Sequence, residues 1–269
     1  LRMPQSSLRA ARRAAAEGIV LLKNDGSLPL KTRTVALYGP GSRKTVKGGS
    51  GSGDVHERYS VTIEEGLKNA GFAFPTTLWM ERFSGKYEAD IAAWRQDVEQ
   101  RIKGYGPIRT MQMFDVIHEN PMPYPSCTPI LEDELTDETD TAIYVLSRQA
   151  GEGRDRRAEK GDYLLSDVET ESLKKLSAQY RKLILVLNCG SVMDLSILDE
   201  TRVDAVLFYG QGGMEGGNAL AEPGKAFDHC LFRFPKSQGN EKRDDHHGGE
   251  ILQYFCKGNT GHQTAGQQA

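Results

Sequence analysis

The sequence predicts an α/β fold: a three-layer sandwich with a mostly parallel, doubly wound sheet. Near-continuous apolar runs alternate with helical patterns, and such runs are typical of strands buried on both faces of a sheet. Loops of unusual composition follow these runs directly, which is where open parallel sheets carry their ligand sites. Four loops fit this description, at residues 39–58, 148–160, 189–192 and 210–217.

The composition favours a globular protein and disfavours two classes of partner. With 38% hydrophobic residues among 269, the chain can build a sizeable core. Its 34 basic and 37 acidic side chains give a net charge of −3 without a long block of one sign, so we expect neither nucleic acid nor a membrane as partner. Four cysteines without short paired spacing suit a reducing compartment, and we expect a cytoplasmic location.

The first elements can be placed from helix caps and apolar runs. A helix is expected over residues 8–17, with Ser7 as its N-cap. A buried strand is expected over 34–38, and the pattern at 62–70 predicts the next helix. The chain therefore begins a strand, glycine-rich loop and helix repeat.

Residues 72–140 have less regular patterning, and we treat them as an elaborated insertion. A strand is expected at 72–78 and a helix at 87–103. Four prolines between 121 and 129 indicate an irregular connector.

Regular patterning returns after the insertion. A strand is expected over 141–147, and the Ser166 to Glu169 spacing is that of a capping box, which predicts a helix to about Tyr180. The later elements are expected at 182–188, 195–198, 205–209 and from 218 onward.

Nucleotide binding is a weaker alternative for this architecture. Lys44 and Thr45 follow a strand as in a phosphate loop, but Arg43 occupies the position that needs glycine. The dinucleotide fingerprint fails in the same way, because Lys44 or Asp54 takes the place of its third glycine.

The loop that begins at Lys47 has the composition of a site for a polar, uncharged ligand. Its glycines allow the backbone to approach a ligand closely. Asp54, together with Lys47 and Arg58, offers the bidentate hydrogen bonding that neighbouring hydroxyl groups of a sugar require. A flexible surface loop would have the same composition and remains an alternative.

The main functional candidate is Glu152, a carboxylate between two glycines. Arg154, Asp155 and Arg156 follow it directly at the end of an apolar strand. Such a loop presents charge to a ligand, although a merely solvated loop accounts for the pattern equally well.

Other polar clusters do not predict a site. Glu215 and the glycines at 216 and 217 are interpreted as structural, with the carboxylate favoured near a helix start. His56 and His118 are isolated, and we expect no metal and no cofactor. The tail contains several potential zinc ligands without zinc spacing, namely His229, Cys230, His246, His247, Cys256 and His262.

Four segments, taken in order, resemble a known family. Residues 14–30, 47–55, 151–156 and 212–221 are similar to the α/β sandwich domain of glycoside hydrolase family 3, of the β-glucosidase type. The resemblance extends over about residues 8–221 and implies an α/β sandwich that packs beside a barrel domain, with the active site between them.

The resemblance also implies roles for individual residues. Glu152 aligns with the general acid/base of a retaining glycosidase, which acts with a carboxylate nucleophile roughly 5–5.5 Å away. The nucleophile belongs to a Ser-Asp-Trp type motif on the barrel, and neither Trp79 nor Trp94 has that context. A β-glucoside or related oligosaccharide is the implied ligand. Its expected contacts are Lys47, Asp54, Arg58, Arg154, Asp155 and Arg156.

The domain limits follow from the extent of this match. Residues 1–221 are expected to form the sandwich, and 222–269 do not match, which we attribute to disorder or a frameshift. The order suggests a member in which the sandwich precedes the barrel. We expect the chain to be inactive, or nearly so, without that barrel. A non-catalytic carbohydrate-binding or interaction module is the principal alternative.

Overall fold

The computed structural model describes residues 4–50, 54–104, 110–149 and 156–222, without the side chains of 110–112. Three of the predicted site residues, Glu152, Arg154 and Asp155, lie outside the described residues. The tail prediction falls outside them too, except for Glu222.

A five-stranded sheet in the described residues forms the centre of the domain, in the order β1-β5-β4-β3-β2. The strands from β2 to β5 are parallel neighbours, and β1 pairs antiparallel to β5 at one edge. All eight side chains of β3 are buried, as are all in β4 except Lys182, which explains their near-continuous apolar sequences. The strand bounds are β1 Val20–Asn24, β2 Ala36–Tyr38, β3 Thr141–Arg148, β4 Lys182–Cys189 and β5 Ala205–Phe208.

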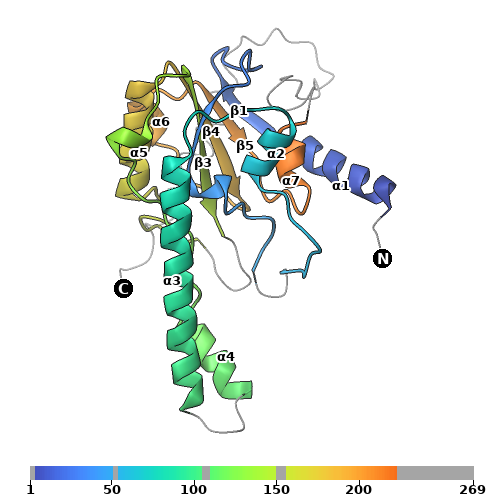
Figure 1. Ribbon diagram of the computed structural model, residues 1–269, viewed down its shortest axis with the longest axis vertical. Helices are drawn as coiled ribbons and strands as arrows, with labels where there is room; N and C mark the ends of the chain where they lie inside the picture. Colours follow the sequence, from blue (N-terminus) through green and yellow to red (C-terminus); the bar gives the residue numbers. More distant parts are fainter. Residues whose placement is uncertain (1–3, 51–53, 105–109, 150–155, 223–269) are drawn as a thin grey trace, which may run out of the picture.

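Helices cover both faces of the sheet, so the predicted three-layer fold is confirmed (Figure 1). On one face lie α5 (Asp167–Gln179) and α6 (Ile197–Glu200). On the other lie α2 (Ile63–Asn69) and α7 (Gly216–Leu220), with α1 (Gln5–Glu17) beside α7.

The predicted helix starts agree with the structure where the N-cap side chain was correctly placed. Thr62 and Ser166 both cap their helices within complete capping boxes. Ser7, by contrast, lies inside α1, which begins at Gln5. The carbonyl of Pro4 already accepts hydrogen bonds from the amides of Ser7 and Leu8, so the helix starts three residues before the position expected for its first residue.

The insertion is a helical hairpin: the helix predicted at 87–103 is present but starts at Leu78, and the strand predicted at 72–78 does not form. Residues 72–78 contribute only an isolated bridge, between Ala73 and Thr34. The helix α3 (Leu78–Lys103) starts at Leu78 because Trp79 and Phe83 anchor its first turns in the core. Its partner α4 (Thr110–Glu119) was not predicted, whereas the irregular connector at 121–129 is confirmed.

Candidate functional site

A buried asparagine holds the ends of three strands together. Asn188, near the end of β4, is fully buried. Its Oδ1 accepts a hydrogen bond from the Val46 amide at 2.7 Å, and its Nδ2 donates to the carbonyls of Val46 at 2.8 Å and Gly210 at 2.9 Å. Because Val46 follows β2 and Gly210 follows β5, three loops meet at this edge.

The loop after β3 joins the same edge. Gln149 donates from Nε2 to the carbonyl of Gly48 at 3.0 Å, and the Gly213 amide donates to the carbonyl of Lys47 at 2.9 Å. The backbone at 46–48 is therefore bonded to the ends of β3, β4 and β5. The predicted gathering of loops at the carboxyl ends of the strands is confirmed for their described residues.

Arg156 closes the base of the loop that carries the main candidate. Its Nη1 pairs with Asp162 at 2.6 Å, its Nε donates to Ser191 Oγ at 2.7 Å, and its Nη2 donates to the Gln149 carbonyl at 3.2 Å. Burial raises the pKa of Asp162, but the hydrogen bond from Arg156 prevails and holds that pKa below its ordinary value. The segment containing Glu152 therefore starts and ends at neighbouring points of this edge.

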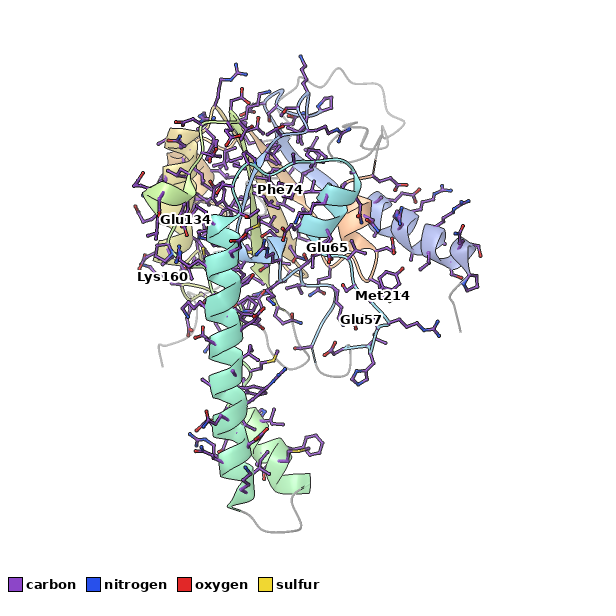
Figure 2. All side chains as sticks on the ribbon, in the orientation of Figure 1. Glu57, Glu65, Phe74, Glu134, Lys160 and Met214 are labelled. Carbon is purple, nitrogen blue, oxygen red and sulfur yellow. The ribbon has the colours of Figure 1, made fainter. Side chains whose placement is uncertain are left out.

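Lys47 and Asp54, two of the predicted sugar contacts, lie close together, and a third residue joins them. The Lys47 Nζ pairs with Glu57, lies 3.5 Å from Asp54 Oδ1 and donates to the Val55 carbonyl at 3.2 Å. The hydrogen bond with Glu57 raises the pKa of Lys47 and lowers that of Glu57. Asp54 and Arg58 are exposed on the same loop as Glu57. Glu57 is labelled in Figure 2 and marks the position of this loop. Glu57 was not predicted as a site residue, because nothing in the sequence indicates that it pairs with Lys47, ten residues earlier.

Glu215 is a structural hub, as interpreted from the sequence. Its buried carboxylate accepts hydrogen bonds from Tyr59 at 2.6 Å, Asn218 at 2.9 Å, and Arg12 at 2.7 and 2.9 Å. Burial raises the pKa of Glu215, but these donors outweigh it and keep the pKa below its ordinary value. The hydrogen bonds of Glu215 therefore connect the Lys47 loop, through Tyr59, to α7 and α1.

Two of the neighbouring glycines permit close helix packing. A Cβ on Gly217 would lie 1.9 Å from the Thr62 carbonyl oxygen, and one on Gly66 would lie 1.9 Å from the Gly217 carbonyl oxygen. Only glycine at both positions lets α2 and α7 approach this closely.

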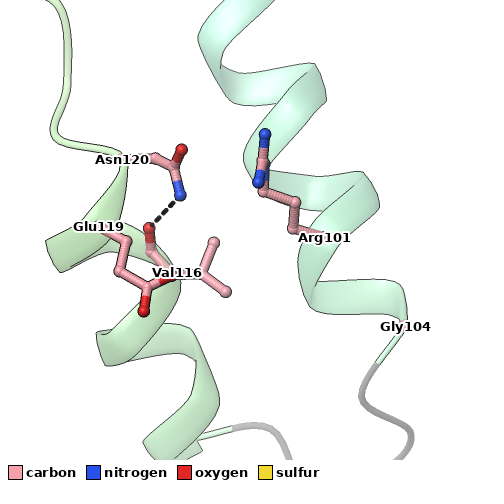
Figure 3. Close-up of a pocket in the computed structure, with 5 residues that line it drawn as sticks. All are labelled: Arg101, Gly104, Val116, Glu119 and Asn120. Atoms are coloured by element: carbon pink, nitrogen blue, oxygen red, sulfur yellow. Dashed lines mark hydrogen bonds between the residues drawn. The ribbon is translucent and has the colours of Figure 1, made fainter.

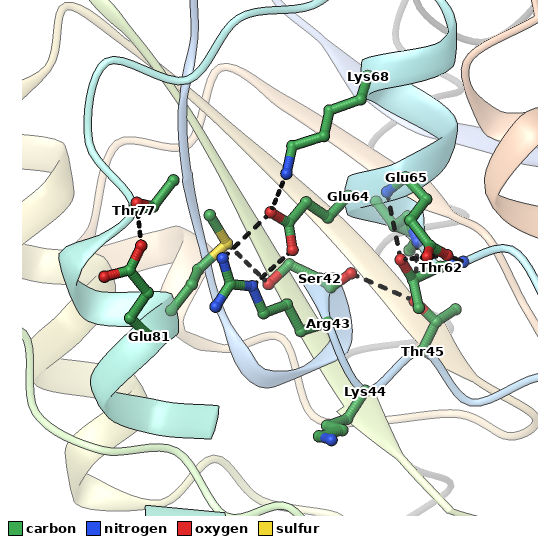
Figure 4. A network of polar contacts seen from close by, with 12 residues as sticks. Ser42, Arg43, Lys44, Thr45, Thr62, Glu64, Glu65, Lys68, Thr77 and Glu81 are labelled. Carbon is green, nitrogen blue, oxygen red and sulfur yellow. Dashed lines mark hydrogen bonds and ion pairs between the residues drawn. The ribbon is translucent and has the colours of Figure 1, made fainter. Parts of the chain in front are cut away.

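Arg43, Lys44 and Thr45, the residues compared with a phosphate loop, make contacts within the protein (Figure 4). Arg43 pairs with the buried Glu64 at 2.6 Å, and Lys44 lies over the ring of Tyr87 at 5.1 Å from its centroid. The Thr45 hydroxyl accepts from the first amide of α2 at 2.9 Å. These contacts leave little for a phosphate and further disfavour nucleotide binding.

A pocket of about 250 Å³ lies away from this edge, between α3 and α4 (Figure 3). Its lining has no set of groups that suggests chemistry. It consists of Arg101, Gly104, Val116, Glu119 and Asn120.

The described ranges contain neither a clustered metal site nor a membrane-spanning helix. There, His, Cys, Asp and Glu side chains form no group of three or more that could hold a metal ion. Nor does any helix there combine the length and apolar character that crossing a bilayer requires.

A match to a known family places this architecture among the glycoside hydrolases. The model described as "Glycosyl hydrolase family 3 C-terminal domain" matches residues 19–223. The chain belongs to glycoside hydrolase family 3, and it corresponds to that C-terminal domain. The resemblance inferred from four short segments is therefore confirmed.

Relatives and solved structures agree with this assignment. The chain is 32% identical to a β-glucosidase of Ruminococcus albus, covering 80% of this chain and 21% of that protein. It is 31% identical to β-glucosidase A of Butyrivibrio fibrisolvens, covering 90% and 31%. The structure of β-glucosidase 3B from Thermotoga neapolitana in complex with glucose matches at 36% identity with a TM-score of 0.62, covering 81% and 29%. The chain thus spans less than a third of the length of each.

Proposed function

We propose that this chain is the sandwich domain of a retaining, β-glucosidase-like exo-glycosidase that hydrolyses O-glycosidic bonds. In this proposal Glu152 is the general acid/base, and the Lys47 loop binds the sugar. Family membership and the β-glucosidase names of the relatives support the reaction class.

The observation that carries the proposal is the junction of Gly48, Gln149 and Arg156. Through it, the loop with the candidate acid leaves the sheet beside the loop with Lys47 and Asp54. The base of the loop that carries the proposed proton donor thereby lies at the same edge as the loop that carries the proposed hydroxyl-binding side chains. Three nitrogens of Arg156 bind the protein, so we assign it to positioning the loop rather than to the sugar.

The remaining proposed sugar contacts are Lys47, Asp54, Arg58, Arg154 and Asp155. Their charged hydrogen-bonding groups suit the hydroxyls of a pyranose ring. Lys47 is already held by Glu57, which fixes its ammonium group before a ligand arrives.

The chemistry requires a second carboxylate. A retaining glycosidase protonates the leaving oxygen with one carboxylic acid and attacks the anomeric carbon with another carboxylate about 5–5.5 Å away. Basic neighbours favour the ionised form of Glu152, so a nearby anionic nucleophile or burial must raise its pKa. We place that nucleophile on a barrel domain, and we expect no turnover by this chain alone.

Hydrolysis of an aryl β-glucoside tests the proposal. The chain fused to the barrel of the Ruminococcus albus relative should turn over, whereas the 269-residue chain should not. Glu152→Ala in the fusion should abolish turnover, and added azide should restore part of it, because a small anion can replace the missing carboxylate as nucleophile or base. Glu159→Ala is the matched control, since Glu159 is an exposed carboxylate that pairs with Arg157. Turnover by the chain alone would contradict the inference that the nucleophile lies on a barrel domain. Full activity of the Glu152→Ala fusion would contradict the assignment of Glu152 as the general acid/base.

A further inference from the structure

The outer face of α4 carries an unusual concentration of exposed apolar side chains. Phe114 is 62% exposed, Ile117 38% and Met113 36%, and Met122, just beyond the helix, is 56% exposed. Residues 113, 114 and 117 lie on one helical face. Phe and Met are enriched in the cores of protein interfaces, so this apolar face of α4 (residues 113–122) has the composition of a contact surface.

The inner side of the hairpin is already used. Val98 of α3 and Val116 of α4 are buried outside the main core, and Trp94 donates from Nε1 to the Asn120 carbonyl at 2.8 Å. These contacts hold α4 against α3. The apolar face of α4 therefore faces outward in a helix pair that is already packed.

The hairpin extends past the site edge of the sheet. Lys44, just after the carboxyl end of β2, contacts the ring of Tyr87 in α3 and lies 3.9 Å from Glu88. Tyr87 is thus level with that edge, and the rest of α3 rises about 24 Å beyond it at 1.5 Å per residue. Figure 1 shows α3 and α4 projecting well beyond the sheet.

The base of this projection is firmly held. Trp79 stacks on Phe83 with ring centroids 5.2 Å apart, and its Nε1 donates to the Thr128 carbonyl at 3.0 Å. Arg82 pairs with the buried Glu134 at 2.6 Å. The hairpin is therefore fixed in direction relative to the sheet.

We propose that the apolar face of α4 is a docking surface for the barrel domain. This inference rests on the proposed function: a domain that brings the nucleophile to the loop edge must occupy the space beyond that edge, and the hairpin borders this space. The matched relatives are several times longer than this chain, so they contain further domains to occupy it.

Hydroxyl-radical labelling of two proteins, read by mass spectrometry, tests the docking surface. In the fusion with the Ruminococcus albus barrel, labelling of residues 113–122 should fall at least fivefold relative to the 269-residue chain. Labelling of Leu78 and Leu131, exposed apolar residues elsewhere, should stay unchanged. Phe114→Glu should restore labelling of Met113 and Met122 in the fusion, and the matched change Leu78→Glu should not.

Unchanged labelling of the apolar face in this fusion and in one built with the Butyrivibrio fibrisolvens barrel would overturn the proposal. So would a dimer of the 269-residue chain, seen by analytical ultracentrifugation, that protects the same residues, since a second copy would then be the occupant. The hydrolysis assay separates the two proposals. Protection without turnover leaves docking in place and contradicts the catalytic function, whereas turnover without protection contradicts docking alone.

Discussion

Arg156 illustrates how one side chain can hold two loops together at the edge of a sheet. Its three hydrogen-bonded partners come from the loops after β3 and β4, and its side chain is only 17% exposed. Arg157, its neighbour, is 72% exposed and contacts the same Asp162 at 3.8 Å. The two arginines therefore form a natural pair for comparison.

Arg156→Ala should lower the free energy of unfolding by about 2 kcal/mol, because charge-assisted hydrogen bonds in a shielded place are lost. Arg157→Ala should change it by less than about 0.5 kcal/mol, since solvent screens an exposed pair. Urea denaturation followed by circular dichroism measures both. Equal effects of the two substitutions would show that the base of the loop is not held by Arg156.

The pair of Arg148 and Glu169 is more deeply buried, and each residue is 3% exposed. Arg148 Nη1 and Nη2 lie 2.6 and 2.7 Å from the two carboxylate oxygens. Arg148→Met should cost about 3–5 kcal/mol of unfolding free energy, because Glu169 would keep a buried charge without its partner. Lys160→Met, which breaks the exposed pair with Asp167, is the control and should cost under about 1 kcal/mol. Chemical denaturation measures both changes. If Arg148→Met lost as little unfolding free energy as Lys160→Met, the expected cost of the unpaired Glu169 charge would be wrong.

At the scale of elements, the glycines of α2 and α3 have opposite roles. A Cβ on Gly66 would meet the backbone of α7, whereas one on Gly85 would meet nothing within 4 Å. Gly66→Ala should destabilise the fold by about 3 kcal/mol through overpacking. Gly85→Ala should stabilise it by about 1 kcal/mol through helix propensity. Thermal unfolding of both variants measures these changes in stability. An unchanged stability of Gly66→Ala would mean that α2 can move away from α7 without cost.

Element prediction succeeded where the signal is local. The capping box at Ser166 places its helix because the two partners are three residues apart. The start of α3 was missed because only four of its 26 residues are buried, so no apolar stripe marks the helix. The same limit applies to α4, whose exposed apolar residues do not indicate a core.

The candidate site shows the same difference between local sequence signals and contacts that only the fold creates. Lys47, Asp54 and Arg156 could be selected from local composition and from the family resemblance. Their partners could not, because Glu57 and Ser191 pair with them only through the fold. Glu152, Arg154 and Asp155 stay predictions.

At the scale of the whole molecule, stability should decrease in acid. Burial raises the pKa of several carboxyls, but their hydrogen-bond donors prevail and hold each pKa below its ordinary value. These are Glu64, Glu134, Asp162 and Glu215. The unfolded chain, with carboxyl pKa values of about 4, takes up protons before the folded chain does. The stabilisation is therefore complete above about pH 5 and is lost as the pH falls through the folded-state pKa values.

Urea unfolding at steps from pH 7 to pH 3 measures this dependence. The free energy of unfolding should be constant near neutral pH with respect to these carboxyls and should fall below about pH 5. Glu215→Gln should show a shallower acid slope than the parent chain. A free energy that does not change between pH 5 and pH 3 would contradict the assigned pKa directions.

Asn188 is a residue at which a covalent change would disturb several strand ends at once. Deamidation would replace its Nδ2 with a carboxylate oxygen, directly facing the carbonyls of Val46 and Gly210. A change of one atom would thus turn two attractions into two repulsions at the meeting point of three strand ends. We therefore expect this edge to keep its hydrogen bonds only while the buried Asn188 amide stays intact.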